Sequence, residues 1–133
     1  MGIRWDTCKV TLSNKTPYPM TRTSYDATAG QYDSAPPTSV AAGGNGSFMV
    51  ESMQDHTWSG CGGDAVYTFT DGTTLNLSYY TSYYYGAGDN SSYTNGFGGA
   101  RGNRYTATGD ANTEGSHGGA GKAVTWPLTI TYT

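Results

Sequence analysis

Tyrosines gathered in one stretch of the chain are the residues best suited to chemistry. The sequence holds 12 tyrosines in 133 residues, and a dense group of them lies between positions 79 and 85. This group consists of Tyr79, Tyr80, Tyr83, Tyr84 and Tyr85. Neighbouring residues of a strand point to opposite faces, so these rings cannot all be buried. An exposed tyrosine has an apolar body and a polar hydroxyl, which suits a membrane interface or a sugar face.

Three further residues extend this predicted ligand-binding group. Ser82 lies inside the tyrosine stretch, Tyr93 follows it, and Trp58 falls in a polar segment between two expected strands. Tyrosine faces attract a quaternary ammonium by cation–π interaction, and hydroxyl groups such as that of Ser82 bind phosphate. An exposed Trp58 would suit a membrane interface. The alternative is that the rings only pack across neighbouring strands and are otherwise exposed as on any surface.

The sequence offers weak material for a metal site and none for a cofactor. Asp89 and Asn90 are followed by two serines, and their oxygens are of the kind that calcium prefers. Calcium takes roughly six to eight oxygen ligands, whereas this group contains one carboxylate. A turn in which the Asp89 or Asn90 side chain bonds the backbone is the favoured interpretation. We therefore expect neither a metal nor a cofactor.

Residue constellations typical of enzymes are absent from the sequence. His56 and His117 are the two histidines, each in a polar stretch, and no Gly-x-Ser-x-Gly motif occurs. Glycoside hydrolysis needs two facing carboxyl groups, and the sequence does not decide whether any pair meets that requirement. The carboxylates in question are Glu51, Asp55, Asp64 and Glu114. We expect a protein that is not an enzyme.

Charge and cysteine content narrow the choice of partners. The formal net charge is −3, which argues against a nucleic-acid-binding surface built on basic residues. Cys8 and Cys61 either form a disulfide or are two buried thiols, and the sequence leaves both interpretations open. Two cysteines with two distant histidines do not have the spacing of a zinc site.

The elements that must position these residues are short strands. Apolar residues alternate with polar ones around positions 8–12, 48–52, 65–69, 75–79 and 124–132. Asp71-Gly72 separates two of these runs, and we expect 64–70 and 73–80 to pair as an antiparallel hairpin. Helix-forming residues are scarce. The sequence therefore predicts one all-β domain over residues 1–133, a two-sheet antiparallel β-sandwich.

Several segments fit this pattern less well. Residues 21–37 are expected to be irregular or edge structure, 103–108 a strand, and 109–121 a long exposed loop. Pro127 interrupts the C-terminal run and indicates an edge strand or a bulge. No run of roughly 20 apolar residues and no signal peptide is visible, so we expect a soluble chain. Whether it is secreted or associates with membranes stays open.

A resemblance to a known family emerges from the order of five short segments. They are Asn14-Lys15-Thr16, Pro36–Val40, Gly46–Ser52, Gly62–Tyr67 and Asp71-Gly72-Thr73, and the tyrosine-rich stretch follows them. In this order the chain resembles small fungal and bacterial proteins of the aegerolysin type, including insecticidal crystal proteins. It is more distantly similar to the β-sandwich of the actinoporins. The resemblance covers residues 8–95.

The resemblance implies a sandwich that recognises membrane lipids. Aegerolysins bind membranes containing sphingolipid and often need a larger partner protein to make a pore. Actinoporins hold a phosphocholine headgroup with serine and tyrosines. The matching positions here are Ser82, Tyr83, Tyr85 and Tyr93, with Tyr79 and Tyr80 nearby. We expect a lipid-headgroup-binding protein, as one component of a cytolytic or insecticidal toxin system.

Two other functions are consistent with the same residues. Stacked tyrosines with Asp and Asn side chains also suit sugar recognition, which would make the protein a lectin. Flat, neutral, tyrosine-rich faces and a strand edge without charge would suit a self-assembling structural or storage protein, present as a homo-oligomer.

Overall fold

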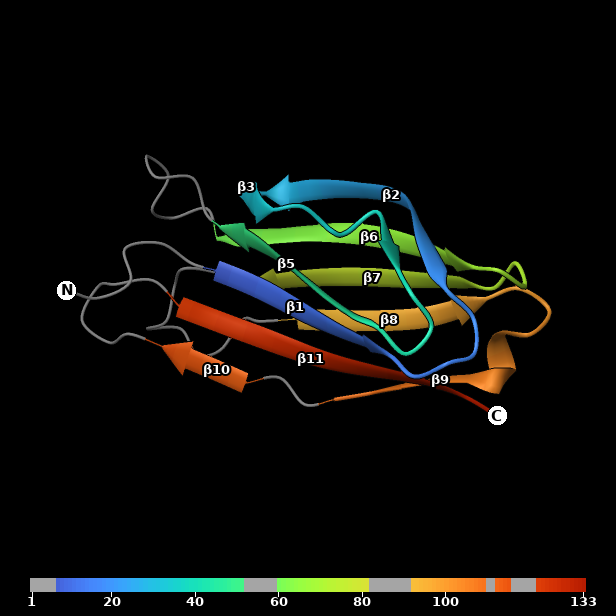
Figure 1. The fold of residues 1–133 in the computed structure, drawn as a ribbon. Coiled ribbons are helices and arrows are strands. Elements are labelled where there is room, and N and C mark those ends of the chain that lie inside the picture. The colour runs from blue at the N-terminus through green and yellow to red at the C-terminus, as the bar shows by residue number, and fades with distance from the viewer. Residues whose placement is uncertain (1–6, 52–59, 82–91, 110–111, 116–121) are drawn as a thin grey trace.

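The computed structural model is a β-sandwich of two sheets (Figure 1) and describes residues 7–51, 60–81, 92–109, 112–115 and 122–133. The six-stranded sheet contains β1 (Thr7–Asn14), β3 (Gln31–Ser34), β5 (Asn45–Glu51), β9 (Tyr105–Thr108), β10 (Asn112–Gly115) and β11 (Lys122–Tyr132). The five-stranded sheet contains β2 (Met20–Ala29), β4 (Ser39–Val40), β6 (Cys61–Phe69), β7 (Thr74–Thr81) and β8 (Ser92–Gly98). A short 3-10 helix, η2 (Gly102–Arg104), precedes β9.

The core confirms the period-two alternation on which the fold prediction depended. Buried residues alternate with more exposed ones along β1 and β7, and along most of β5, β6 and the described part of β11, because the two sheets pack their inward faces against each other. Phe48 and Trp126 from the six-stranded sheet and Tyr67 and Leu77 from the five-stranded sheet are among the buried side chains. Burying a side chain of this size stabilises the fold by roughly 1.5–3 kcal/mol.

The predicted hairpin is confirmed. β6 and β7 pair antiparallel from Cys61 opposite Thr81 to Thr68 opposite Thr74. The turn between them contains Gly72 at a φ of 90°, a conformation that favours glycine. The Asp71 carboxylate accepts a hydrogen bond of 3.0 Å from the Thr73 backbone N–H, which fixes this turn.

The first and last strands lie side by side in the middle of the six-stranded sheet. β1 pairs parallel with β11, from Thr7 opposite Ala123 to Asn14 opposite Ile130, and antiparallel with β5. Because β11 also pairs with β9 and β10, it is not the edge strand that Pro127 had indicated. Pro127 lies between the part of β11 that pairs with β10 and the part that pairs with β9. Neither pairing therefore needs the backbone N–H that proline lacks.

Two segments contain strands that the alternation did not reveal. Residues 21–37, expected to be irregular or edge structure, contain the edge strand β3 and most of β2, which pairs with β6 and, at Met20 and Thr21, with β4 on its other side. Residues 109–121, expected to be a long loop, contain β10. β2 exposes side chains on both faces, which removes the alternation that would have revealed it.

The sandwich has two ends that differ in what they carry. At one end β1 begins at Thr7, β5 ends at Glu51, β7 ends at Thr81 and β8 begins at Ser92; we call this the loop end. At the other end lies the β6–β7 turn with Asp71, together with the residues that follow Asn14; we call this the turn end.

Candidate functional site

The strands that flank the tyrosine-rich stretch end at the loop end. β7 and β8 pair up to Tyr80 opposite Ser92, so the stretch is connected to two neighbouring strands. Of the predicted ligand-binding residues, the structure describes Tyr79, Tyr80 and Tyr93. The others lie outside the described residues: Trp58, Ser82, Tyr83, Tyr84 and Tyr85, as do Asp89 and Asn90.

Tyr79 points into the core, so the expectation of an exposed ring does not hold for it. Its side chain is 1% exposed, because it shares the inward face of β7 with Leu75 and Leu77. Its hydroxyl forms a hydrogen bond with that of Tyr32 on β3, which joins the two sheets. Burial and this hydrogen bond raise the pKa of Tyr79 well above the usual range of a phenol. Tyr79 is therefore part of the core and is not open to a ligand.

Tyr93 is half-buried against the opposite sheet. Its ring stacks on Trp126 with the ring centres 5.6 Å apart and the planes 18° from parallel. Trp126 also contacts Tyr79, at 6.4 Å between ring centres. Burial raises the pKa of Tyr93 to about 12. The rings of Tyr79, Trp126 and Tyr93 thus form a cross-sheet aromatic layer near the loop end, which holds β7 and β8 against β11.

Tyr80 lies on the outer face of the five-stranded sheet and is half-buried. It is paired with Gly62 on β6, and its ring lies over that glycine. A Cβ at position 62 would come within 2.9 Å of the Tyr80 ring and 2.6 Å of the Tyr79 carbonyl oxygen. Glycine is required at position 62 because the ring and backbone approach it so closely.

An exposed aromatic group on the edge of the sandwich was missed by sequence reasoning. Tyr25 on β2 is 43% exposed, and the Arg22 guanidinium carbon lies 4.3 Å from the centre of its ring. Tyr32 also contacts the Tyr25 ring, in a T-shaped arrangement with 5.4 Å between ring centres. We call Arg22, Tyr25 and Tyr32 the aromatic edge. In a regular strand, two residues three positions apart, such as Arg22 and Tyr25, have side chains on opposite faces. β2 is bulged between Arg22 and Ser24, and the bulge brings these two side chains to the same face.

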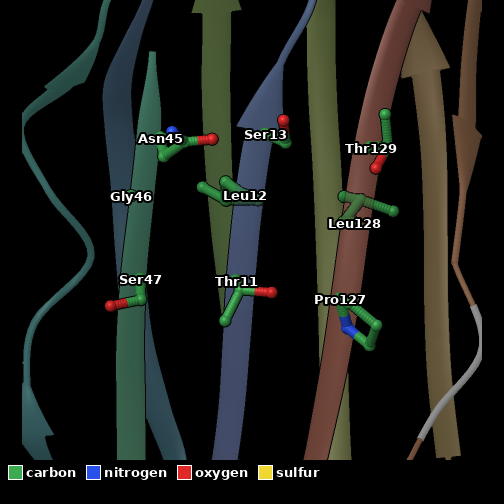
Figure 2. Close-up of a pocket in the computed structure, with 9 residues that line it drawn as sticks. All are labelled: Thr11, Leu12, Ser13, Asn45, Gly46, Ser47, Pro127, Leu128 and Thr129. Atoms are coloured by element: carbon green, nitrogen blue, oxygen red, sulfur yellow. The ribbon is translucent and has the colours of Figure 1, made fainter.

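The outer face of each sheet has a shallow trough. The one on the six-stranded sheet has a volume of about 540 Å³, and Figure 2 shows its side chains on β1, β5 and β11. Its walls carry hydroxyl groups, one amide and a proline, from Thr11, Leu12, Ser13, Asn45, Gly46, Ser47, Pro127, Leu128 and Thr129. The trough on the five-stranded sheet has a volume of about 490 Å³ and is lined by Asp64, Val66, Asn76, Leu77, Ser78, Thr94, Asn95 and Gly96. The second trough therefore combines a carboxylate with two amides, whereas the first has no charged group.

Neither a metal site nor a membrane-spanning helix is found in the part of the chain that the structure describes. Histidine, cysteine and acidic side chains do not gather there in groups of three. None of the helices in that part is long and apolar enough to cross a membrane.

Comparison with known proteins shows a likeness of fold. No protein-family model and no curated protein sequence matches the chain. Among solved structures, the chain is similar to the crystal structure of the lipid binding protein Nakanori, with a TM-score of 0.68. The two are 14% identical in sequence, and the match covers 98% of this chain and 71% of that one. A likeness at this identity establishes the β-sandwich fold.

Proposed function

We propose that this protein binds membrane lipids by their headgroups, through the tyrosine-rich stretch at the loop end. The observation that carries the proposal is the likeness of fold, over 98% of the chain, to a protein described as lipid binding. The sequence adds the dense tyrosine group between positions 79 and 85, which suits choline and phosphate chemistry.

The described residues give this stretch a rigid base. Tyr79, Trp126 and Tyr93 pack across the sheets immediately beneath it, so the strand ends at Thr81 and Ser92 are held in place. Fixed attachment points lower the entropy lost when a connecting segment binds a ligand. The buried tyrosines thus serve the site by holding its base, and the binding contacts fall to Ser82, Tyr83, Tyr84 and Tyr85.

The aromatic edge extends the same surface chemistry along the side of the sandwich. Arg22 provides a positive charge for a lipid phosphate, and Tyr25 provides an exposed ring for the interfacial zone. Tyr32 connects both to the Tyr79 hydroxyl at the base of the loop end. We expect the aromatic edge to add to membrane affinity without determining headgroup choice.

Vesicle co-sedimentation tests the proposal. The vesicles contain phosphatidylcholine alone, phosphatidylcholine with sphingomyelin, both with cholesterol, or phosphatidylcholine with phosphatidylserine. We expect binding to at least one choline-headgroup composition, reduced by about tenfold in Tyr83→Ala combined with Tyr85→Ala, since each cation–π contact contributes about 0.5–2 kcal/mol. Thr106→Ala, an exposed position near the turn end, is the matched control and should bind as the unaltered protein does. Failure to bind any of these vesicles would remove the proposal.

A narrower form of the proposal is that lipid binding serves a cytolytic or insecticidal system with a larger partner protein. Dye release from vesicles that bind the protein tests this form. We expect no release by the chain alone and release once a larger pore-forming protein is added to vesicles that carry the bound chain. Release by the partner in the absence of the chain would contradict this narrower role while leaving lipid binding intact.

Glycan binding is the second candidate, and the trough on the five-stranded sheet is the observation that favours it. Asp64, Asn76 and Asn95 supply the carboxylate and amides that hydrogen-bond sugar hydroxyls. Tyr80 lies two residues beyond Ser78 on the same outer face, where its ring can flank a sugar. A glycan array tests this function. Binding that is abolished by Asn76→Ala and kept in Thr11→Ala, a change in the other trough, would support a lectin. Absence of binding to every glycan on the array would exclude the lectin function.

A further inference from the structure

The two cysteines face each other across the interior of the sandwich. Cys8 is on β1 of the six-stranded sheet and Cys61 begins β6 of the five-stranded sheet. Both side chains are 0% exposed, and their sulfur atoms lie 2.9 Å apart. The Cys8 sulfur also lies 3.1 Å from the carbonyl oxygen of Cys61. A disulfide bond is roughly 2.0 Å long, so forming one here requires the sulfurs to approach by about 1 Å.

From this juxtaposition we propose that Cys8 and Cys61 form a disulfide that links the two sheets at the loop end. The bond would be the covalent connection between β1 and β6, which share no backbone hydrogen bonds. It would close a loop between residues 53 positions apart in the sequence. Closing a loop of this length restricts the unfolded chain strongly, and the native sheets already hold the two sulfurs in contact.

Other uses of the pair fit the structure less well. A zinc ion would need about four ligands, and the described residues contain no group of three histidine, cysteine or acidic side chains. A catalytic thiol pair would need access to a substrate, whereas both sulfurs are fully buried. If the two cysteines served only as apolar packing, nothing would favour a contact as close as 2.9 Å between their sulfurs over a contact with a neighbouring methyl group. At 2.9 Å the two thiols are within hydrogen-bonding distance, which describes the reduced pair, and oxidation would convert that contact into the covalent link.

The oxidation requires a disulfide-bearing oxidant, such as oxidised glutathione. One cysteine thiolate attacks a glutathione sulfur, forms a mixed disulfide and releases one reduced glutathione. The second cysteine thiolate then attacks the protein sulfur of that mixed disulfide and releases the second glutathione. Two protons leave the cysteines, and two electrons pass from them to the oxidant. Because the folded chain buries both sulfurs, exchange occurs while the sheets close during folding or when they open locally.

The link would tie together strands that meet beneath the tyrosine-rich stretch. Cys61 is paired with Thr81, the last residue of β7, and Cys8 is paired with Val50 and Val124. The disulfide would therefore hold β1 and β6 together where the cross-sheet aromatic layer also lies. It is independent of what the loop end binds, so its test does not depend on a lipid or glycan ligand.

Mass spectrometry of the full chain tests the proposal directly. The protein is refolded with oxidised and reduced glutathione, then denatured and treated with N-ethylmaleimide. We expect a monomer that has lost about 2 Da and carries no maleimide, whereas protein first treated with dithiothreitol carries two maleimide groups. Two maleimide groups after oxidative refolding, or a disulfide-linked dimer, would overturn the inference.

Thermal unfolding gives a second measurement. We expect the oxidised protein to melt roughly 10–20 °C above the reduced protein. The Cys8→Ala, Cys61→Ala double variant should melt at the same temperature with and without dithiothreitol. If oxidised and reduced wild-type protein melt at the same temperature, the cysteines do not link the sheets. The mass measurement stands even if the double variant fails to fold.

Discussion

The loop end and the turn end of the sandwich share aromatic packing and differ in their other buried contacts. At the turn end the Asn14 side chain, 0% exposed, donates to the carbonyls of Tyr18 at 2.9 Å and Ala41 at 3.2 Å and accepts from the Thr16 hydroxyl at 2.7 Å. At the loop end the rings of Tyr79, Trp126 and Tyr93 are accompanied by the sulfurs of the two cysteines.

This difference bears on how each end responds to substitution. Directional hydrogen bonds to backbone groups fix the turn end in one geometry, because any change leaves buried partners unsatisfied. Aromatic and sulfur contacts are less directional. The buried polar network therefore fixes the geometry of the turn end, whereas at the loop end the packed rings and sulfurs contribute mainly through the apolar surface that they bury.

The largest expected effect comes from removing the ring that joins the sheets at the loop end. Tyr79→Ala should lower the free energy of unfolding by about 4 kcal/mol, since a fully buried aromatic side chain is lost. Tyr79→Phe should cost only about 1 kcal/mol, the contribution of its hydrogen bond to Tyr32. Urea unfolding measures both. Equal losses for the two variants would mean that the hydroxyl, and not the ring, holds this end together.

The next effect tests the turn end. Asn14→Ala should lower the free energy of unfolding by about 3 kcal/mol, because the hydroxyl of Thr16 and the carbonyls of Tyr18 and Ala41 lose buried partners. Urea unfolding is again the measurement, with the exposed Asn45→Ala as control. A loss below about 1 kcal/mol would contradict the idea that directional polar contacts hold the turn end.

A smaller, pH-dependent effect is expected from Asp71. Burial alone would raise the pKa of its carboxyl, but hydrogen bonds from the Thr73 N–H and the Tyr105 hydroxyl lower it overall. Because the pKa of Asp71 is lower in the folded protein than in the unfolded chain, ionised Asp71 stabilises the fold. This stabilisation is fully present above the unfolded pKa of about 3.9 and is lost as the pH falls through the folded pKa. Tyr105→Phe should cost about 1 kcal/mol at neutral pH and less below about pH 4.

Stability curves of the Tyr105→Phe variant and the unaltered protein at pH 7 and pH 3 check this expectation. The two proteins should differ less at the acidic pH, because protonated Asp71 gains less from the hydroxyl. A difference that is the same at both pH values would show that the Asp71–Tyr105 contact is not what the hydroxyl contributes.

The smallest effect on stability is expected at Tyr93. Its buried hydroxyl makes no well-formed hydrogen bond within the described part of the chain, although Asn95 lies close to it, while its ring stacks on Trp126. Tyr93→Phe should change the free energy of unfolding by less than about 0.5 kcal/mol and leave vesicle binding unchanged. Loss of vesicle binding in this variant, with stability unchanged, would show that the Tyr93 hydroxyl itself meets a ligand.

The sequence predicted the parts of the fold that local patterns determine. Alternation revealed β1, β5, β6, β7 and β11, and Asp71-Gly72 revealed the hairpin, because both signals depend on neighbouring residues. The parallel pairing of β1 with β11 was not predictable, since it joins residues far apart in the chain. β2 was not recognised because, after Met20, none of its side chains is fully buried and no alternation results.

The candidate site was less predictable for a related reason. Composition alone identified the tyrosine-rich stretch, but the inward direction of Tyr79 follows from its register with Leu75 and Leu77, which was available in the alternation. The contact of Arg22 with Tyr25 depends on a bulge, which no local pattern signalled. The meeting of Cys8 and Cys61 depends on how the two sheets pack.

The parallel pairing of β1 with β11 also governs how the molecule bears mechanical load. β1 starts at the loop end, and β11, running in the same direction, finishes at the turn end. Tension applied before Thr7 and after Tyr132 would pull the two strands past each other, so that all their hydrogen bonds are loaded at once. Such shear resists rupture far better than peeling strands apart one bond at a time. The sandwich should therefore withstand stretching along its long axis while its outer strands can be peeled away.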